Sequence, residues 1–153
     1  MPRGGLGRIR YGSTEISFPS TVGVEAVAAA GDQNLTERTV TVALPTGAII
    51  DRAMLIPDIT AMNDSATAHK IDLGVSGRLG AGGWVVQLAT MLDVIGFPAA
   101  DGATTGWTGI LDVSALVTAA GAYGFRFLVN QSGGANSVRY TTLFILKVTY
   151  RMA

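Results

Sequence analysis

Alternating apolar and polar residues run through most of the chain and predict a protein built from β-strands. Within residues 37–44, Val40, Val42 and Leu44 fall on one face and Thr39 and Thr41 on the other, which is the period of two expected of a half-buried strand. The alternation recurs over residues 66–76, and a glycine-rich connection follows at 77–83. Residues 84–91 and 92–97 are further strand candidates. Residues 112–120 are the best candidate for a single helical turn or a short helix, capped by Asp112 or Ser114.

The clearest strand patterns lie in the last third of the chain. Residues 123–129 place aromatic residues and a valine on one face, and residues 138–152 keep the alternation for much longer than the roughly 5–6 residues of a typical strand. The opposite face of that last strand also carries Leu143 and Ile145. We therefore expect the middle of this outer face to be covered as well, with Leu143 and Ile145 as interaction residues.

Proline and glycine divide these patterns into short pieces. Pro57 is expected to end the extended run at 48–56, and residues 99–106 have the composition of a surface loop. About seven or eight short strands separated by turns predict an all-β fold, either an antiparallel β-sandwich of jelly-roll type or a barrel. Residues 1–10 lack a core-forming pattern, so we expect a flexible N-terminal arm followed by a single β-sandwich domain at 11–153.

Composition removes several classes of protein. The 153 residues contain no cysteine and one histidine, and 11 basic residues balance 11 acidic ones. A disulfide scaffold, a thiol enzyme, a cysteine-ligated metal site and a strongly basic nucleic-acid binder are therefore excluded. Charged residues make up only 14% of the chain, whereas 48% is hydrophobic. This balance favours obligate assembly through interfaces depleted of charge, unless alanine and glycine alone raise the apolar share.

The sequence contains no catalytic or cofactor-binding motif, so we expect neither enzymatic activity nor a cofactor. The single histidine, His69, lies on the apolar side of a strand pattern, and a nucleophilic site would need such a base beside its nucleophile. Asp58, Asn63 and Asp64 could offer oxygen atoms to calcium, but their spacing is not that of an EF-hand loop. We therefore expect no metal site.

Two local features could serve binding. Trp84 and Trp107 both neighbour glycines, and exposed aromatic rings beside small residues can form a platform for sugar rings. The alternative is that both tryptophans are buried anchors of the core or of an interface. The N-terminal arm carries Arg3, Arg8 and Arg10 as its only charged side chains, which could pair with carboxylates or carbonyls of a neighbouring subunit.

One stretch of the chain resembles a known family. Residues 112–117 read Asp-Val-Ser-Ala-Leu-Val, and residues 123–127 read Tyr-Gly-Phe-Arg-Phe. A segment of this kind precedes a paired strand in many jelly-roll sandwiches and also occurs in carbohydrate-binding modules. The whole chain, which is short, free of cysteine and rich in glycine, alanine, threonine and valine, is similar to small virion structural proteins of tailed viruses (phages). Among these it most resembles capsid decoration, or cement, proteins.

Two hypotheses from different classes follow. The first, implied by the resemblance, is a virion structural protein: a homo-oligomer, with a trimer favoured, that contacts a major capsid protein or another shell, tail or fibre component. It expects a location in the virion and neither nucleic acid nor membrane as a partner. The second is a lectin-like β-sandwich that binds carbohydrate through Trp84, Trp107 or a tyrosine.

Overall fold

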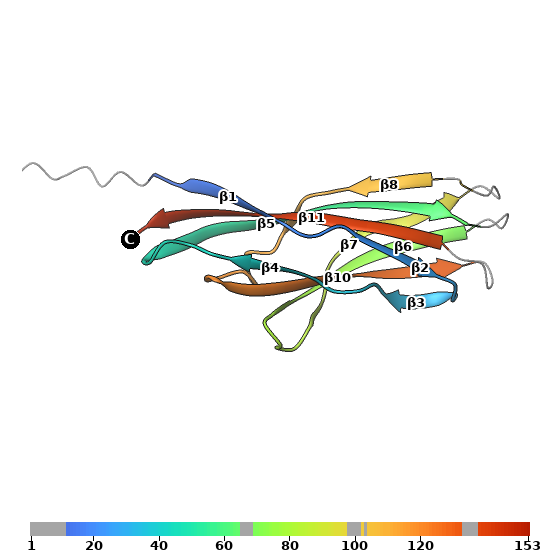
Figure 1. Ribbon diagram of the computed structural model, residues 1–153, viewed down its shortest axis with the longest axis horizontal. Helices are drawn as coiled ribbons and strands as arrows, with labels where there is room; N and C mark the ends of the chain where they lie inside the picture. Colours follow the sequence, from blue (N-terminus) through green and yellow to red (C-terminus); the bar gives the residue numbers. More distant parts are fainter. Residues whose placement is uncertain (1–11, 65–68, 98–101, 103, 133–137) are drawn as a thin grey trace, which may run out of the picture.

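The computed structural model of the chain describes residues 12–64, 69–97, 102, 104–132 and 138–153. These residues form eleven β-strands and no helix, and the strands run along the length of an elongated body (Figure 1). The strands are β1 Thr14–Pro19, β2 Gly23–Val27, β3 Gly31–Asn34, β4 Arg38–Val42, β5 Ala48–Asn63, β6 His69–Leu79, β7 Val85–Phe97, β8 Thr104–Thr108, β9 Leu111–Asp112, β10 Gly121–Ser132 and β11 Val138–Met152.

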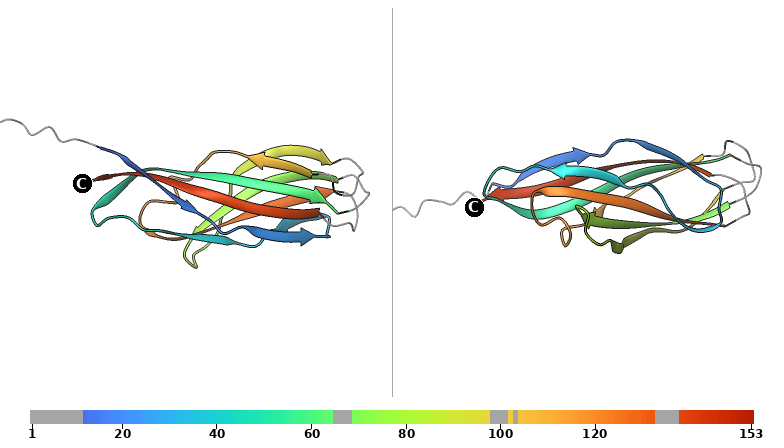
Figure 2. Two further views of the ribbon diagram at one scale, coloured as in Figure 1. Left: turned by 45° about the horizontal axis from the view of Figure 1, so that its top comes forward. Right: turned by 60° about the horizontal axis from the view of Figure 1, so that its bottom comes forward.

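The strands form two antiparallel sheets that pack against each other (Figure 2). One sheet has the order β1-β11-β5-β8, and the other has the order β3-β10-β6-β7. The three remaining strands continue interrupted edges: β2 continues β1 along β11, β9 continues β8 along β5, and β4 continues β3 along β10. This interleaved order is that of a double-sheet jelly roll. The expected all-β, jelly-roll-like sandwich is therefore confirmed.

The edge made of β1 and β2 is interrupted at Ser20 without losing its bonds to β11. The Ser20 backbone N–H donates to the Phe144 carbonyl over 2.9 Å, and the Phe144 N–H donates to the Ser20 hydroxyl oxygen over 2.9 Å. The serine side chain thus replaces a backbone acceptor at the point where the strand is broken. This edge of the sheet is therefore bonded to β11 along β1, at Ser20 and along β2.

The same arrangement explains why Pro57 does not end a strand. Pro57 lies opposite Phe144, whose backbone N–H and carbonyl both point away from it, toward Ser20. The proline nitrogen therefore faces the other neighbour, where β8 ends at Thr108 and β9 begins only at Leu111. No ladder hydrogen bond is lost there. The expectation that the run 48–56 ends at Pro57 is wrong, because β5 continues to residue 63.

One core fills the space between the sheets. Phe125 of β10 and Phe144 of β11 meet edge to face, with ring centroids 5.2 Å apart and an interplanar angle of 73°. The buried Tyr140 hydroxyl donates to Oε1 of Gln131 over 2.9 Å, and Nε2 of Gln131 donates to the Val27 carbonyl over 3.1 Å. Since Tyr140 and Val27 belong to one sheet and Gln131 to the other, a hydrogen-bonded bridge joins the sheets inside the core.

The other predicted segments agree with the structure to different degrees. The last strand has the predicted bounds, and the two strands predicted over 84–97 form a single strand, β7, at Val85–Phe97. The predicted connection at 77–83 is shorter, because β6 runs to Leu79 before a turn with φ +54° at Gly80. The predicted loop at 99–106 is wrong from Thr104 onward, where β8 begins. The arm at 1–10 lies outside the described residues.

Candidate interaction surface

Among the described residues, no group of three or more histidine, cysteine or acidic side chains is placed to hold a metal ion. The calcium candidates do not converge. Asp58 and Asn63 lie on opposite faces of β5, so Asp58 is exposed and Asn63 is buried. Asp64 pairs with Arg139 over 3.2 Å. The side chain of His69 lies outside the described residues. The described residues include no helix that could cross a membrane.

The most distinctive surface is the outer face of the sheet that contains β11. Residues paired across neighbouring strands point to the same face, and Ile145 pairs with Pro19 on one side and Ile56 on the other. Leu143 lies two residues before Ile145 on β11 and therefore on the same face. Thr141, two residues before Leu143, also lies on this face and pairs with Val24 of β2. We call these five residues the outer apolar patch: Pro19, Val24, Ile56, Leu143 and Ile145.

The outer apolar patch is open to solvent at its centre and at its β2 edge. Ile145 is 36% exposed and Val24 is 63% exposed, and the neighbouring Val22 is 61% exposed. Leu143 and Ile56 are half-buried. The sequence-based placement of Leu143 and Ile145 on an apolar outer face is therefore confirmed, while their role in an interaction stays a prediction.

Ion pairs flank the outer apolar patch toward both ends of the sheet. At one end, Lys147 pairs with Glu15 over 3.2 Å, and Arg52 lies 4.0 Å from Asp112. At the other end, Arg139 pairs with Asp64. Between them, the exposed carboxylate of Asp58 lies opposite Leu143, and no described residue forms an ion pair with it. An apolar centre within a polar rim is the usual anatomy of a protein–protein interface.

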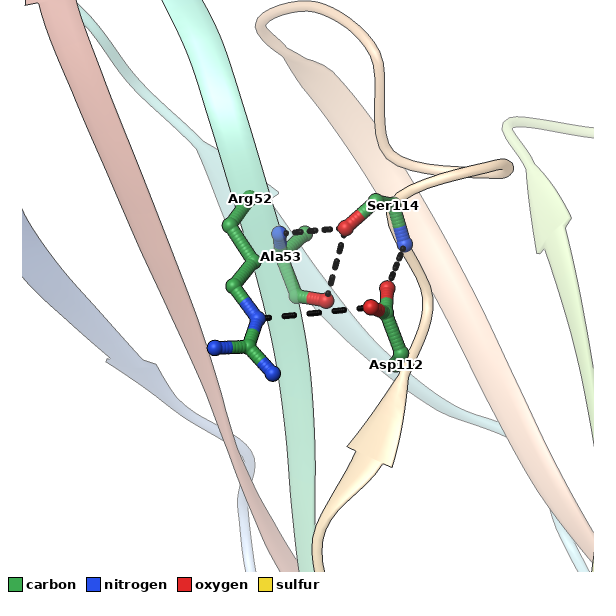
Figure 3. A network of polar contacts seen from close by, with 4 residues as sticks. All are labelled: Arg52, Ala53, Asp112 and Ser114. Atoms are coloured by element: carbon green, nitrogen blue, oxygen red, sulfur yellow. Dashed lines mark hydrogen bonds and ion pairs between the residues drawn. The ribbon is translucent and has the colours of Figure 1, made fainter.

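Strand β9 and the turn after it fix the far edge of this sheet (Figure 3). The Ser114 hydroxyl accepts a hydrogen bond from the Ala53 N–H over 2.9 Å and lies 3.4 Å from the Ala53 carbonyl, so a side chain extends the ladder along β5. The Ser114 N–H donates to Oδ1 of Asp112 over 2.9 Å. Ser114, through its hydroxyl first and its backbone N–H second, lowers the pKa of Asp112.

Of the two alternatives predicted for residues 112–120, the single turn is confirmed and the short helix is wrong. The Val117 N–H donates to the Val113 carbonyl over 2.9 Å, and the chain then continues to β10 without forming a helix. Asp112 acts as the cap through the bond that it accepts from the residue two positions on.

The two tryptophans have different environments. Trp107 is 5% exposed and lies opposite Ile59, so of the two alternatives for this residue the buried core anchor is confirmed and the exposed platform is wrong. Trp84 is half-buried and directly precedes β7. The guanidinium carbons of Arg78 and Arg126 lie 4.6 Å and 4.0 Å from the Trp84 ring centroid, within the range of cation–π attraction.

A shallow groove lies beside this cluster on the outer face of the second sheet. Nε of Arg78 donates to Oε1 of Glu37 over 2.9 Å, and Nη2 of Arg78 donates to Oε2, so the pair is bidentate. Glu37 reaches Arg78 across Gly124, where a Cβ would overlap the carboxylate. The groove has a volume of about 320 Å³. Its lining is Glu37, Thr39, Thr41, Arg78, Gly80, Ala81, Ala122, Tyr123 and Gly124.

Sequence reasoning found some of these residues and missed others. Leu143, Ile145 and Trp84 lie on surfaces where they can contact a partner, whereas Arg3, Arg8 and Arg10 lie outside the described residues. It missed Val24 and Ile56 because their exposure depends on strand order. It missed the Glu37–Arg78 pair because 41 residues separate its members, although the glycine in Tyr-Gly-Phe at 123–125 was a local signal.

Comparisons with known proteins give little. No protein-family model matches the chain, and no curated protein matches it significantly. Among solved structures, the chain is similar to a chain in the structure of the Gx strain of infectious bursal disease virus, with a TM-score of 0.46 and 10% sequence identity. The similarity covers 92% of this chain and 37% of that chain. Similarity at this level says nothing about function.

Proposed function

We propose that this chain is a virion structural protein, a homo-oligomeric decoration protein that stabilises a particle surface through protein–protein contacts and has no enzymatic role. The outer apolar patch is the observation that carries the proposal. The strand order supports it as well, because double-sheet jelly rolls are used by viral capsid proteins and by lectins. The resemblance to cement proteins favours a trimer.

The outer apolar patch needs a partner for a physical reason. Antiparallel sheets commonly expose one face to water, and that face is then polar. Here Val24, Ile56, Leu143 and Ile145 break that rule at the middle of the face, while polar pairs remain at both ends. Covering these side chains would remove apolar area from water at about 25 cal/mol per Å². We propose a second copy of the chain as the cover.

The Arg-bearing arm gives this interface a polar component. An arginine binds a carboxylate through paired hydrogen bonds, and Asp58 is an exposed carboxylate beside Leu143 of the outer apolar patch that forms an ion pair with no described residue. In the proposed assembly, Arg3, Arg8 or Arg10 of one subunit meets Asp58 of the next. Removing the arm should therefore weaken the assembly more at low than at high salt, because salt screens exposed ion pairs.

Sedimentation with virus particles tests the role. Particles purified from cultures that encode the chain should contain it in fixed stoichiometry to the major capsid protein, measured by quantitative mass spectrometry of gradient fractions. Purified chain should also rebind particles stripped of it and raise their resistance to heat. An Ile145→Asp variant should rebind more weakly, whereas Thr36→Asp, an exposed position outside the patch, should not. Absence of the chain from the particles would contradict the proposal.

A further inference from the structure

The groove on the second sheet combines one polar end with a largely apolar lining. Its lining includes Thr39 and Thr41 on one side of β10, and Arg78, which bonds to Glu37, on the other. Gly80, Ala81, Ala122 and Gly124 also line it, and because these residues are small, a ligand could approach the backbone closely. The groove's volume of about 320 Å³ is at the lower end of the range for small-molecule sites. A groove of this size can hold one six-membered ring.

The polar end of the groove is held in place before any ligand arrives. The Glu37–Arg78 pair is bidentate, and the side chains of Arg78 and Glu37 are only 26% and 22% exposed. The Trp84 ring stacks against the guanidinium of Arg78 and that of Arg126, which restricts the arginine further. A preorganised group loses little conformational entropy on binding.

The chemistry of these groups selects the class of ligand. A carboxylate accepts hydrogen bonds, a guanidinium donates them, and threonine hydroxyls do both, so the groove matches a ligand whose groups also donate and accept. Adjacent hydroxyls of a sugar ring have this property. A simple anion is a poorer match, because Arg78 is the only cation among the described residues that line the groove and Glu37 is paired with it. An apolar ligand would leave the charged pair without its water.

We propose that this groove binds one pyranose ring of a neutral saccharide, with adjacent hydroxyls bonded to Glu37 and Arg78 and the ring lying over Ala122. The site lies on the sheet opposite the outer apolar patch and uses none of its residues. It is therefore independent of the proposed virion assembly, and either proposal can fail without the other.

Nuclear magnetic resonance of the ¹⁵N-labelled full chain tests the site. The probes are D-glucose, D-galactose, D-mannose and N-acetyl-D-glucosamine, each at tens of millimolar, with sodium acetate as the anion control. At least one sugar should shift the amide signals of Gly80, Ala122 and Gly124 and the Nε signal of Arg78, with a millimolar dissociation constant. Acetate should leave these signals in place.

Two variants test the placement. Ala122→Leu fills the groove from an exposed position and should weaken sugar binding at least tenfold, whereas Ala115→Leu, exposed in a turn of the other sheet, should bind as the native chain does. Glu37→Gln should also bind at least several-fold more weakly. The proposal is overturned if no sugar shifts these signals, if acetate shifts them equally, or if folded Ala122→Leu binds unchanged.

Discussion

Replacement of Tyr140 by phenylalanine tests the polar bridge that joins the two sheets inside the core. The Tyr140 hydroxyl is the donor to Oε1 of Gln131, and both side chains are almost completely buried. The substitution removes one oxygen atom and leaves the ring in place. Oε1 of Gln131 then remains buried without that donor, while Nε2 still donates to the Val27 carbonyl.

The size of the effect follows from this geometry. A buried polar atom left without its partner costs about 1–3 kcal/mol, and little ring packing is lost to offset or enlarge that figure. For a domain of about 150 residues, each kcal/mol lowers Tm by roughly 2–4 °C. We therefore expect Tyr140→Phe to lower Tm by roughly 2–12 °C at a fixed protein concentration, which must be held constant because oligomers unfold in a concentration-dependent way.

Alkaline unfolding gives a second readout for the same residue. Burial raises the pKa of Tyr140 above the ordinary value of about 10. The folded state thus holds the proton more tightly than the unfolded state, and the stability from this group is complete below about pH 10 and lost as the pH rises further. Tyr140→Phe should reduce that alkaline loss of stability.

A matched control keeps this prediction falsifiable. Tyr150 lies in the same strand and is half-buried. Its hydroxyl forms no hydrogen bond with any described residue. Tyr150→Phe should change the free energy of unfolding by less than about 0.5 kcal/mol. Thermal and urea unfolding measured for both variants decide the matter. Equal Tm values for Tyr140→Phe and the native chain would refute the bridge.

Three further predictions follow from local contacts. Phe144→Ala removes one ring of the buried edge-to-face pair with Phe125 and should cost about 3–5 kcal/mol in urea unfolding. Ser114 lowers the pKa of Asp112, so the stability that this carboxylate gives is present above its unfolded pKa of about 4 and is lost as pH falls. Ser114→Ala should raise the titration midpoint of Asp112 measured by NMR. An unchanged midpoint would contradict the assignment of the shift to Ser114. Gly124→Ala should displace Glu37 and shift the Arg78 Nε signal, with a stability change below about 1 kcal/mol because the pair is partly exposed.

Much of the fold could be predicted from local sequence because strand alternation is a local property. The last strand has the predicted bounds, since each of its inner residues is apolar or threonine from Val138 to Val148. Pro57 misled the prediction because its effect depends on a gap in the neighbouring strand, which no local pattern encodes. Trp107 likewise has glycine neighbours in sequence, but its place opposite Ile59 buries it.

The candidate surfaces were less accessible to sequence reasoning because they depend on which strands are neighbours. Leu143 and Ile145 could be placed on an outer face by alternation alone. That Val24 and Ile56 extend this face follows only from the pairing of β2 and β5 with β11. The groove depends on a bond between residues from two parts of the chain, Glu37 and Arg78, and the missing side chain of Gly124 makes room for it.

The mass of the chain in solution tests the central claim, assembly through the outer apolar patch, most directly. One chain has a mass of 15.8 kDa, and a trimer would have three times that mass, about 47 kDa. Analytical ultracentrifugation at micromolar concentration should give an oligomer for the native chain and a smaller species for folded Ile145→Asp, while Thr36→Asp keeps the native mass. A native chain that sediments as a monomer, or an oligomer that Ile145→Asp leaves intact, would contradict the claim.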